Sequence, residues 1–168
     1  MRQDMHTHSM SPGMEGESDC LIRTVCSSDY ECLANLAGQL GYPSSIEDVS
    51  RRLAEMRDAL HSVVYVAEDL ELHVVGWVGV FIFTSVVEDK HAEISGLIVD
   101  QSARSHGVGA KLLSSAEQWA RANGCRNLFV RSNVIRERAH QFYLRHDYRI
   151  TKSQNIFVKL LDRRSRRS

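Results

Sequence analysis

Hydrophobic residues near the start of the chain form one short apolar run and then two stripes at helical spacing. The run, Leu21–Cys26, suits a strand. The first stripe comprises Leu33, Leu36 and Leu40, and the second comprises Val49, Leu53, Met56 and Leu60. Each stripe follows four residues with the form of a capping box, Ser28–Glu31 and Ser44–Glu47, and Gly41-Tyr42-Pro43 separates them. The pattern therefore predicts a strand followed by two consecutive helices.

Further along, strand spacing and helical spacing exchange several times. Runs rich in β-branched and aromatic residues predict a hairpin over Val63–Glu68 and His73–Val86, and further strands over His91–Val99, Asn127–Arg131, Tyr148–Thr151 and Asn155–Leu161. Apolar stripes predict helices over Gly107–Ala122, with Asn123-Gly124 as its C-cap, and over Ile135–Arg145. The order β-α-α-β-β-β-α-β-α-β-β indicates a mixed sheet flanked by helices, of the α/β or α+β class.

The two ends of the chain lack such periodicity. Residues 1–19 are polar, contain Pro and Gly, and hold four of the five Met, so we expect a disordered leader. Residues 162–168 place four Arg in a seven-residue tail. We expect this tail to be solvated, with a docking patch for an acidic partner as the alternative. Residues 20–161 are then the folded domain.

Composition narrows the class of protein. A chain of 168 residues with 43% hydrophobic and 25% charged residues is typical of one globular domain. Its 21 basic and 21 acidic residues cancel, which argues against nucleic acid or an anionic membrane as the main partner. No run approaches the roughly 20 apolar residues of a membrane span, and no signal peptide is recognisable. The four Cys and eight His show no metal-ligand spacing. We expect a cytoplasmic protein without a metal.

The stretch from Leu97 to Leu113 carries the strongest chemical signal. A strand runs into a loop with Gly107 and Gly109, and an amphipathic helix follows. Free N–H groups at a helix start, beside glycines that allow close approach, form an anion site. The spacing is not that of a P-loop, which needs Gly-Lys-Ser/Thr. It is not a dinucleotide fingerprint either, because Leu112 stands where a third Gly is required.

The sequence Arg104-Ser105-His106-Gly107-Val108-Gly109 has the form R-x-x-G-x-G. Further along, Asn133, Arg136, Ala139, Phe142 and Tyr143 give N-x-x-R-x-x-A-x-x-F-Y. Together these blocks resemble the GCN5-related N-acetyltransferase (GNAT) superfamily over about residues 20–161. The resemblance implies a mostly antiparallel sheet of about seven strands with four helices and one splayed strand pair. Asp147 stands where the family commonly has Gly, and Asp tolerates the left-handed backbone that this turn needs.

The resemblance also implies acetyl-CoA as co-substrate. Backbone N–H groups from Arg104 to Ala110 would bind its pyrophosphate, and Asn133 would bond the pantetheine arm, order a water, or act only as a cap or turn. The N–H of Leu97 or Ile98 would bind the thioester oxygen, next to a bulge suggested by Gly96. The expected acetyl-CoA site comprises Leu97, Ile98, Val99, Arg104, Ser105, His106, Gly107, Val108, Gly109, Ala110, Asn133 and Tyr143. Tyr143 would protonate the departing thiolate, the alternative being a packed tyrosine bonded to backbone.

An acceptor amine must lose a proton before it attacks a thioester. Glu93 is a carboxylate on an otherwise mostly apolar strand, so it is our candidate general base, directly or through water; the alternative is a rim salt bridge. Cys125 has no identifiable His and carboxylate partners, which favours direct transfer in a ternary complex over an acyl-cysteine.

The expected reaction is N-acetylation of a small-molecule amine. The stretch Gln39–Pro43 resembles aminoglycoside-type members, and we expect the acceptor to bind near residues 39–50 and 85–91. Carboxylates available to a cationic acceptor are Glu47, Asp48, Glu68, Asp69, Glu88 and Asp89. A protein or peptide acetyltransferase and a non-catalytic acetyl-CoA-binding module remain alternatives. The apolar residues of the strand over Trp77–Phe83 and of the last two strands would permit a homodimer.

Overall fold

The structure of the protein, a computed structural model, describes residues 19–58 and 61–161. It divides into two compact units, with the boundary between Arg131 and Ser132. The predicted leader, apart from residue 19, and the predicted basic tail lie outside the described residues. Each unit is described in turn.

The first unit is built on a five-stranded sheet. Its strands are β1 (Leu21–Thr24), β2 (Ser62–Glu68), β3 (Val74–Phe83), β4 (His91–Val99) and β5 (Leu128–Val130), and they lie in that order across the sheet. The first four pair antiparallel, and β5 runs parallel to β4. The change of direction at β4 and β5 is possible because a helix crosses over between them.

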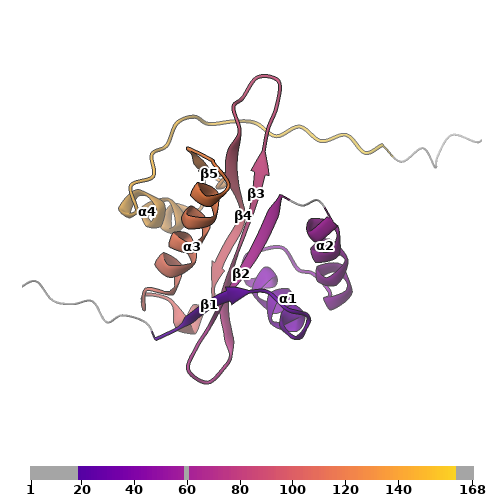
Figure 1. Ribbon diagram of the computed structural model, residues 1–168, viewed down its shortest axis with the longest axis vertical. Helices are drawn as coiled ribbons and strands as arrows, with labels where there is room; N and C mark the ends of the chain where they lie inside the picture. Colours follow the sequence, from indigo (N-terminus) through magenta and orange to yellow (C-terminus); the bar gives the residue numbers. More distant parts are fainter. Residues whose placement is uncertain (1–18, 59–60, 162–168) are drawn as a thin grey trace, which may run out of the picture. The chain divides into compact units, whose positions relative to one another are not determined.

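Helices cover both faces of this sheet (Figure 1). After the short turn η1 (Ser27–Asp29), α1 (Tyr30–Gln39) and α2 (Ile46–Asp58) lie on one face, and α3 (Val108–Ala122) lies on the other. The turn η2 (Gln101–Ala103) precedes α3. The central strands are buried from both sides, and the fully buried side chains include Val66, Val78, Val80, Leu112 and Leu113. Burying such side chains is the main stabilising term, at about 1.5–3 kcal/mol each.

The second unit contains α4 (Glu137–Arg145) and an extended segment. The mixed α/β class and the four α-helices are as predicted, but the sheet has five strands rather than about seven. The strands predicted at Tyr148–Thr151 and Asn155–Leu161 are wrong for the described chain, where residues 148–161 form no strand. The β propensity of these residues shows only that their side chains suit a strand. To form a strand, the segment also needs a neighbouring strand with which its backbone can hydrogen-bond.

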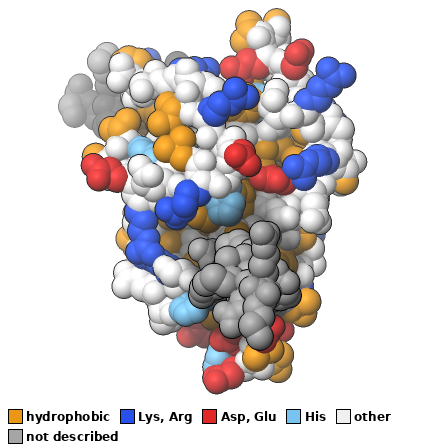
Figure 2. Space-filling view, turned by 90° about the vertical axis from the view of Figure 1, so that its left-hand side faces the viewer, with side chains coloured by type: hydrophobic (Ala, Val, Ile, Leu, Met, Phe, Trp, Pro, Cys, Tyr) orange, Lys and Arg blue, Asp and Glu red, His pale blue; other side chains and the backbone are white. Residues whose placement is uncertain are grey.

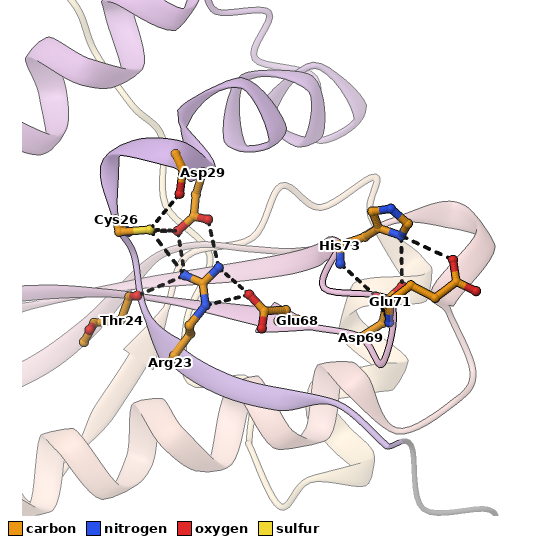
Figure 3. A network of polar contacts seen from close by, with 9 residues as sticks. Arg23, Thr24, Cys26, Asp29, Glu68, Asp69, Glu71 and His73 are labelled. Carbon is orange, nitrogen blue, oxygen red and sulfur yellow. Dashed lines mark hydrogen bonds and ion pairs between the residues drawn. The ribbon is translucent and has the colours of Figure 1, made fainter.

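A network of charged groups links β1, the start of α1 and the end of β2 (Figure 3). The Arg23 guanidinium donates to both carboxylate oxygens of Asp29, at 2.7 and 2.9 Å, and to Glu68 at 2.6 and 2.8 Å. The backbone N–H of Cys26 donates to Asp29 at 2.8 Å. Asp29 is only 4% exposed, so these bonds compensate a buried charge.

Replacing Asp29 with Asn should remove pH-dependent stability. The hydrogen bonds from Arg23, with a smaller contribution from Cys26, lower the pKa of Asp29 from 3.8 to about 2. The stabilisation is therefore complete above about pH 4 and is lost as the pH falls from 4 to 2, and it amounts to about 2 kcal/mol. In urea unfolding, the Asn variant should lose this amount at pH 7 and much less at pH 2. Asp48→Asn, which breaks an exposed pair with Arg51, is the control and should change little; equal losses would contradict the assignment.

Basic and acidic side chains both occur among the coloured residues of Figure 2. This agrees with the formal net charge of zero. Among the described residues, no helix combines the length and apolar character that crossing a bilayer requires.

Candidate active site

The start of α3 presents backbone N–H groups without a side-chain cap. Gly107, the N-cap, has a left-handed φ of 79°, and no described side chain caps the helix. The backbone N–H of Lys111 donates to the carbonyl of Gly107 at 3.1 Å. The preceding amides, of Val108, Gly109 and Ala110, belong to the group that a helix cannot satisfy internally. Together with the helix dipole they make this end suited to a phosphate.

The loop between β4 and α3 is braced by its own side chains. The Nε–H of Arg104 donates to the carbonyl of Val99 at 2.9 Å, so at most its Nη groups are left to reach a ligand. Asp100 accepts from the backbone N–H of Ser102 and the side chain of Gln39, both at 2.8 Å. Hydrogen bonds from Ser102, then Gln39, hold the pKa of Asp100 below its ordinary value. Ser105 has a positive φ of 69°, an uncommon conformation for a non-glycine residue.

A β-bulge interrupts β4 at Ser95, opposite β3. Gly79 of β3 pairs with Gly96, while the next residue of β3 pairs with Ile94, so Ser95 has no partner in the register. A Cβ on Gly79 would lie 2.5 Å from the Ser95 hydroxyl, and one on Gly96 would lie 2.7 Å from the Trp77 ring. Glycine at both positions is therefore required by close packing, and the bulge expected from Gly96 is confirmed.

Strand β5 pairs along its whole length, but only with the beginning of β4. The register joins Ala92 to Leu128 and ends with Ile94 opposite Val130, whereas β4 continues to Val99. The part of β4 that contains Leu97 and Ile98 thus has no pairing with β5. Strand β4 therefore extends beyond the end of β5.

A cavity of about 560 Å³ lies over the same bulge, within the first unit. Its lining is mostly apolar and comprises Leu33, Ala37, Leu40, Gly41, Tyr42, Pro43, Ser44, Val49, Arg52, Leu53, Met56, Val64, Trp77, Gly79 and Ser95. The Arg52 guanidinium donates to the Ser44 hydroxyl at 2.8 Å. The indole Nε1 of Trp77 is buried without a hydrogen-bond partner among the described residues.

The cavity overlaps part of the region predicted for the acceptor. It is lined by residues from the predicted 39–50 region, but the 85–91 region does not contribute. None of the six carboxylates considered for a cationic acceptor lines it, and its one charged lining residue is Arg52. The sequence could not show which charged residues line the cavity, because the spacing of charges along the chain does not reveal which face of a helix borders a cavity.

Glu93 is buried and ion-paired. Its two carboxylate oxygens accept hydrogen bonds from Arg131 at 2.7 and 3.2 Å, and this bond raises the pKa of Arg131. The Glu93 carboxylate is buried, whereas 55% of the Arg131 side chain is exposed, so the pair lies where the core meets the surface, as the salt-bridge alternative for Glu93 expects. Since Arg131 occupies one lone pair on each oxygen, a proton-accepting role for Glu93 would use the remaining lone pairs, directly or through water.

The second unit carries the other two predicted site residues. Asn133 forms a turn, in which its side-chain oxygen accepts from the N–H of Ile135 at 3.2 Å and its carbonyl accepts from the N–H of Arg136 at 3.0 Å. Arg136 is the N-cap of α4, which begins at Glu137 and not at Ile135. Asn133 is therefore a turn residue and not the cap of this helix.

Tyr143 lies on α4 among other aromatic rings. Its ring centroid is 5.2 Å from that of Phe142 and 5.5 Å from that of Tyr148. Burial raises the pKa of Tyr143 to about 12, and the charge of Arg136 opposes this only in part. The phenol is therefore protonated at every physiological pH, so it can donate a hydrogen bond or a proton and does not act as a phenolate base.

The turn after α4 has the conformation expected of it. Asp147 adopts a left-handed φ of 64°, and the N–H of Tyr148 donates to the carbonyl of Tyr143 at 3.1 Å. The prediction that Asp can replace a glycine here is confirmed. The second unit thus holds Asn133, Tyr143 and this turn. The first unit contains the cavity, the bulge, Glu93, and the loop from Leu97 to Ala110.

Comparison with known proteins identifies relatives of the whole described fold. Residues 30–148 match the acetyltransferase (GNAT) family. A curated relative, the aminoalkylphosphonate N-acetyltransferase of Salmonella typhimurium, is 27% identical over 147 residues and covers 86% of each chain.

Solved structures agree on the fold. The aminoglycoside 6'-N-acetyltransferase AAC(6')-Ih from Acinetobacter baumannii superposes with a TM-score of 0.75 at 16% identity, covering 85% of this chain and 99% of its own. AAC(6')-Iy, solved with the bisubstrate analog CoA-S-monomethyl-acetylneamine, gives a TM-score of 0.74 at 18% identity, with coverage of 85% and 99%.

Proposed function

Because the chain belongs to the acetyltransferase (GNAT) family and is thus an acyltransferase that uses acetyl-CoA, we propose that it acetylates the primary amine of a small molecule that also carries an anionic group. We further propose that the transfer is direct, within a ternary complex. The expected ligands of this site are acetyl-CoA and the acceptor, with no metal.

One observation carries the proposal: a single strand connects an uncapped helix start to a bulge that borders a cavity. At its far end β4 leads to Gly107 and the first amides of α3, which suit a diphosphate. At the bulge, Ser95 lines the cavity. The part of β4 between them, with Leu97 and Ile98, is unpaired with β5. A thioester placed along this part would have anion-binding amides at one end and room for an acceptor at the other.

The proposed chemistry needs few groups. The neutral amine nitrogen attacks the thioester carbonyl carbon, a C–N bond forms, and the C–S bond then breaks. The N–H of Leu97 or Ile98 would stabilise the oxyanion that develops on the carbonyl oxygen. A proton leaves the amine nitrogen toward Glu93 or a water, and the departing thiolate takes a proton from Tyr143.

The charge of the cavity favours an anionic acceptor over a polycationic one. Arg52, fixed by its bond to Ser44, is the charged residue of the lining, and the lining contains no carboxylate. A phosphonate or carboxylate beside Arg52 would gain charge-assisted hydrogen bonds. The Salmonella relative acts, by its name, on aminoalkylphosphonates, which combine an amine with such an anion.

An amine panel tests this function. Purified protein with acetyl-CoA should release coenzyme A, measured with a thiol reagent, when given an aminoalkylphosphonate or an amino acid of similar length. An amino alcohol of that length and an aminoglycoside should give a kcat/KM at least roughly tenfold lower, because a charge-assisted hydrogen bond is worth about 1.5–3 kcal/mol. Acetyl-CoA binding with no turnover of any amine would contradict an enzyme, and turnover of peptides alone would contradict a small acceptor.

Replacing Arg52 with Met should raise KM for the preferred acidic amine by about tenfold, because an exposed charge-assisted contact is lost. The KM of an amine that lacks an anionic group should stay unchanged, since Met keeps the apolar stem of the side chain. Arg51→Met is the matched control, because Arg51 bonds Asp48 and Glu55 and does not line the cavity. An equal rise in KM for neutral and acidic amines would contradict anion recognition by Arg52.

A further inference from the structure

The cavity that α1 and α2 border on one face of the sheet has mostly apolar walls (Figure 1). From α1 and its C-cap come Leu33, Ala37 and Leu40, which are three or four positions apart and so lie along one stripe of the helix. From α2 come Val49 and Leu53, which are four positions apart. Most of the surface that a bound acceptor would meet is therefore hydrocarbon.

Polar side chains make up a small part of the lining. Arg52 is the charged lining residue, and its bond to the Ser44 hydroxyl at 2.8 Å fixes its position. Ser95 lies at the bulge of β4, and Tyr42 is mostly exposed. An anionic group on the acceptor can therefore meet an opposite charge at Arg52, while the rest of the acceptor meets walls that offer few hydrogen bonds.

The volume of the cavity exceeds what a small charged amine fills. At about 560 Å³ it falls within the roughly 300–1,000 Å³ of pockets that hold drug-sized ligands. A short-chain aminoalkylphosphonate would leave much of this space to water, at about 30 Å³ per molecule. Water against apolar walls lacks hydrogen-bond partners, so replacing it with carbon should raise affinity by about fourfold per CH₂ group.

The space is not a consequence of loose packing at the bulge. A Cβ on Gly79 would lie 2.5 Å from the Ser95 hydroxyl, and one on Gly96 would lie 2.7 Å from the Trp77 ring, so the strands that border the cavity are tightly packed there. Val64, which lines the cavity from β2, is itself buried. The volume is therefore a defined space between well-packed elements.

We propose that the acceptor is an amphiphilic amine, an amino acid or aminophosphonate whose aliphatic or aromatic side chain fills the apolar part of the cavity while its anionic group lies at Arg52. This inference rests on the proposed function and narrows its substrate class. Sugar-based amines are disfavoured, because their hydroxyl groups would lose hydrogen bonds to water and gain few from apolar walls. Short polar amines are disfavoured because they leave the apolar walls hydrated.

A series of amino acids in which only the side chain grows tests the proposal. With acetyl-CoA, kcat/KM should rise about fourfold per CH₂ group from alanine through 2-aminobutyrate and norvaline to norleucine, a total of roughly 60-fold. The amine and the carboxylate are the same in all four compounds, so the trend reports the side chain alone. A series that is flat, or that falls with length, would overturn the proposal.

Replacing Ala37 with Leu should remove much of this gain, because Ala37 lies between Leu33 and Leu40 in the stripe and a larger side chain there takes up cavity volume. The ratio of kcat/KM for norleucine to that for alanine should fall at least roughly tenfold. Asn35→Leu is the matched control, since Asn35 is exposed on the same helix and does not line the cavity, and it should leave the ratio unchanged. An Ala37→Leu variant that folds and keeps the original ratio would contradict the proposal.

Binding of carboxylates that lack an amine tests the same preference without acetyl transfer. Calorimetry on the unmodified chain should show a Kd that falls about fourfold per CH₂ group from pentanoate to octanoate. In a Trp119→Phe variant Trp77 is the only tryptophan, and its fluorescence should change when octanoate binds, because Trp77 lines the cavity. A Kd independent of chain length, or octanoate binding that leaves Trp77 fluorescence unchanged, would overturn the proposal.

The two sets of measurements separate this inference from the proposed function. If carboxylates bind with the expected dependence on length but no amine is acetylated, the proposed function fails and the preference of the cavity for an apolar body stands. If an amine is acetylated but neither series depends on length, the proposed function stands and the amphiphilic acceptor is wrong.

Discussion

Phenylalanine in place of Tyr143 is expected to lower kcat about 100-fold and to leave the affinity for acetyl-CoA nearly unchanged. The proposed role is to protonate the departing thiolate, and general-acid contributions are roughly 10²–10⁴-fold. We expect a contribution at the low end of this range, because a thiolate is a better leaving group than an alkoxide or an amide anion. The variant retains an aromatic ring at position 143 that can pack against Phe142 and Tyr148, so the fold should persist.

The pH dependence separates this role from a structural one. Because burial raises the pKa of Tyr143 to about 12, the phenol stays protonated below about pH 11 and should add no acidic or neutral limb to the rate profile. Steady-state kinetics on Tyr143→Phe, with acetyl-CoA affinity measured by calorimetry, checks this. Unchanged kcat would remove the acid role, and a loss of affinity equal to the loss of kcat would indicate a packing role instead.

The same assay addresses the base. Glu93→Gln should lower kcat/KM and remove a limb of the profile if Glu93 receives the amine proton. If the profile keeps its shape, the bond between Glu93 and Arg131 is structural and the proton leaves to another group.

Valine at Gly107 is expected to weaken acetyl-CoA binding by at least roughly tenfold. Gly107 holds a φ of 79°, where a β-branched residue is strained by at least about 1–2 kcal/mol, and relief of that strain would turn the following amides away from the diphosphate. Isothermal calorimetry with coenzyme A measures the loss directly.

Gly124→Val is the matched control for Gly107→Val. Gly124 lies just beyond the other end of α3 with a φ of 75°, and a side chain there would meet open space. Both variants therefore carry similar backbone strain and should lose similar free energy of unfolding. Only the Gly107 variant should lose coenzyme A affinity, and an equal loss in both would mean that binding follows general stability and not the loop.

Local sequence patterns predicted most of the first unit. Strand β4 runs over His91–Val99 as expected, because an apolar run bounded by polar turns is a local signal. Helix α2 begins at Ile46, where the hydroxyl of Ser45 accepts from the N–H of Asp48, so the cap lies one residue later than the predicted box over Ser44–Glu47. The bulge at Gly96 and the left-handed turn at Asp147 followed from single residues whose backbone preferences are known.

Long-range pairing was beyond such patterns. Nothing near Glu93 in the sequence indicates Arg131, which is 38 positions away and reaches it only because β4 and β5 run parallel. The bond between Arg52 and Ser44 depends on how α2 is oriented at the cavity, and the position of the Trp77 indole depends on the absence of a side chain at Gly96 of the neighbouring strand. The last two strands were predicted from propensity, which does not report whether a partner strand exists.

The central claim is that main-chain amides at the start of α3 bind the diphosphate of acetyl-CoA. Backbone amide resonances in ¹H–¹⁵N spectra, recorded while coenzyme A is added, test it most directly, with pantetheine, which lacks the diphosphate, as the comparison. The account predicts that the amides of Val108, Gly109 and Ala110 shift with coenzyme A and stay in place with pantetheine. Binding of coenzyme A that leaves these three resonances unmoved would contradict it.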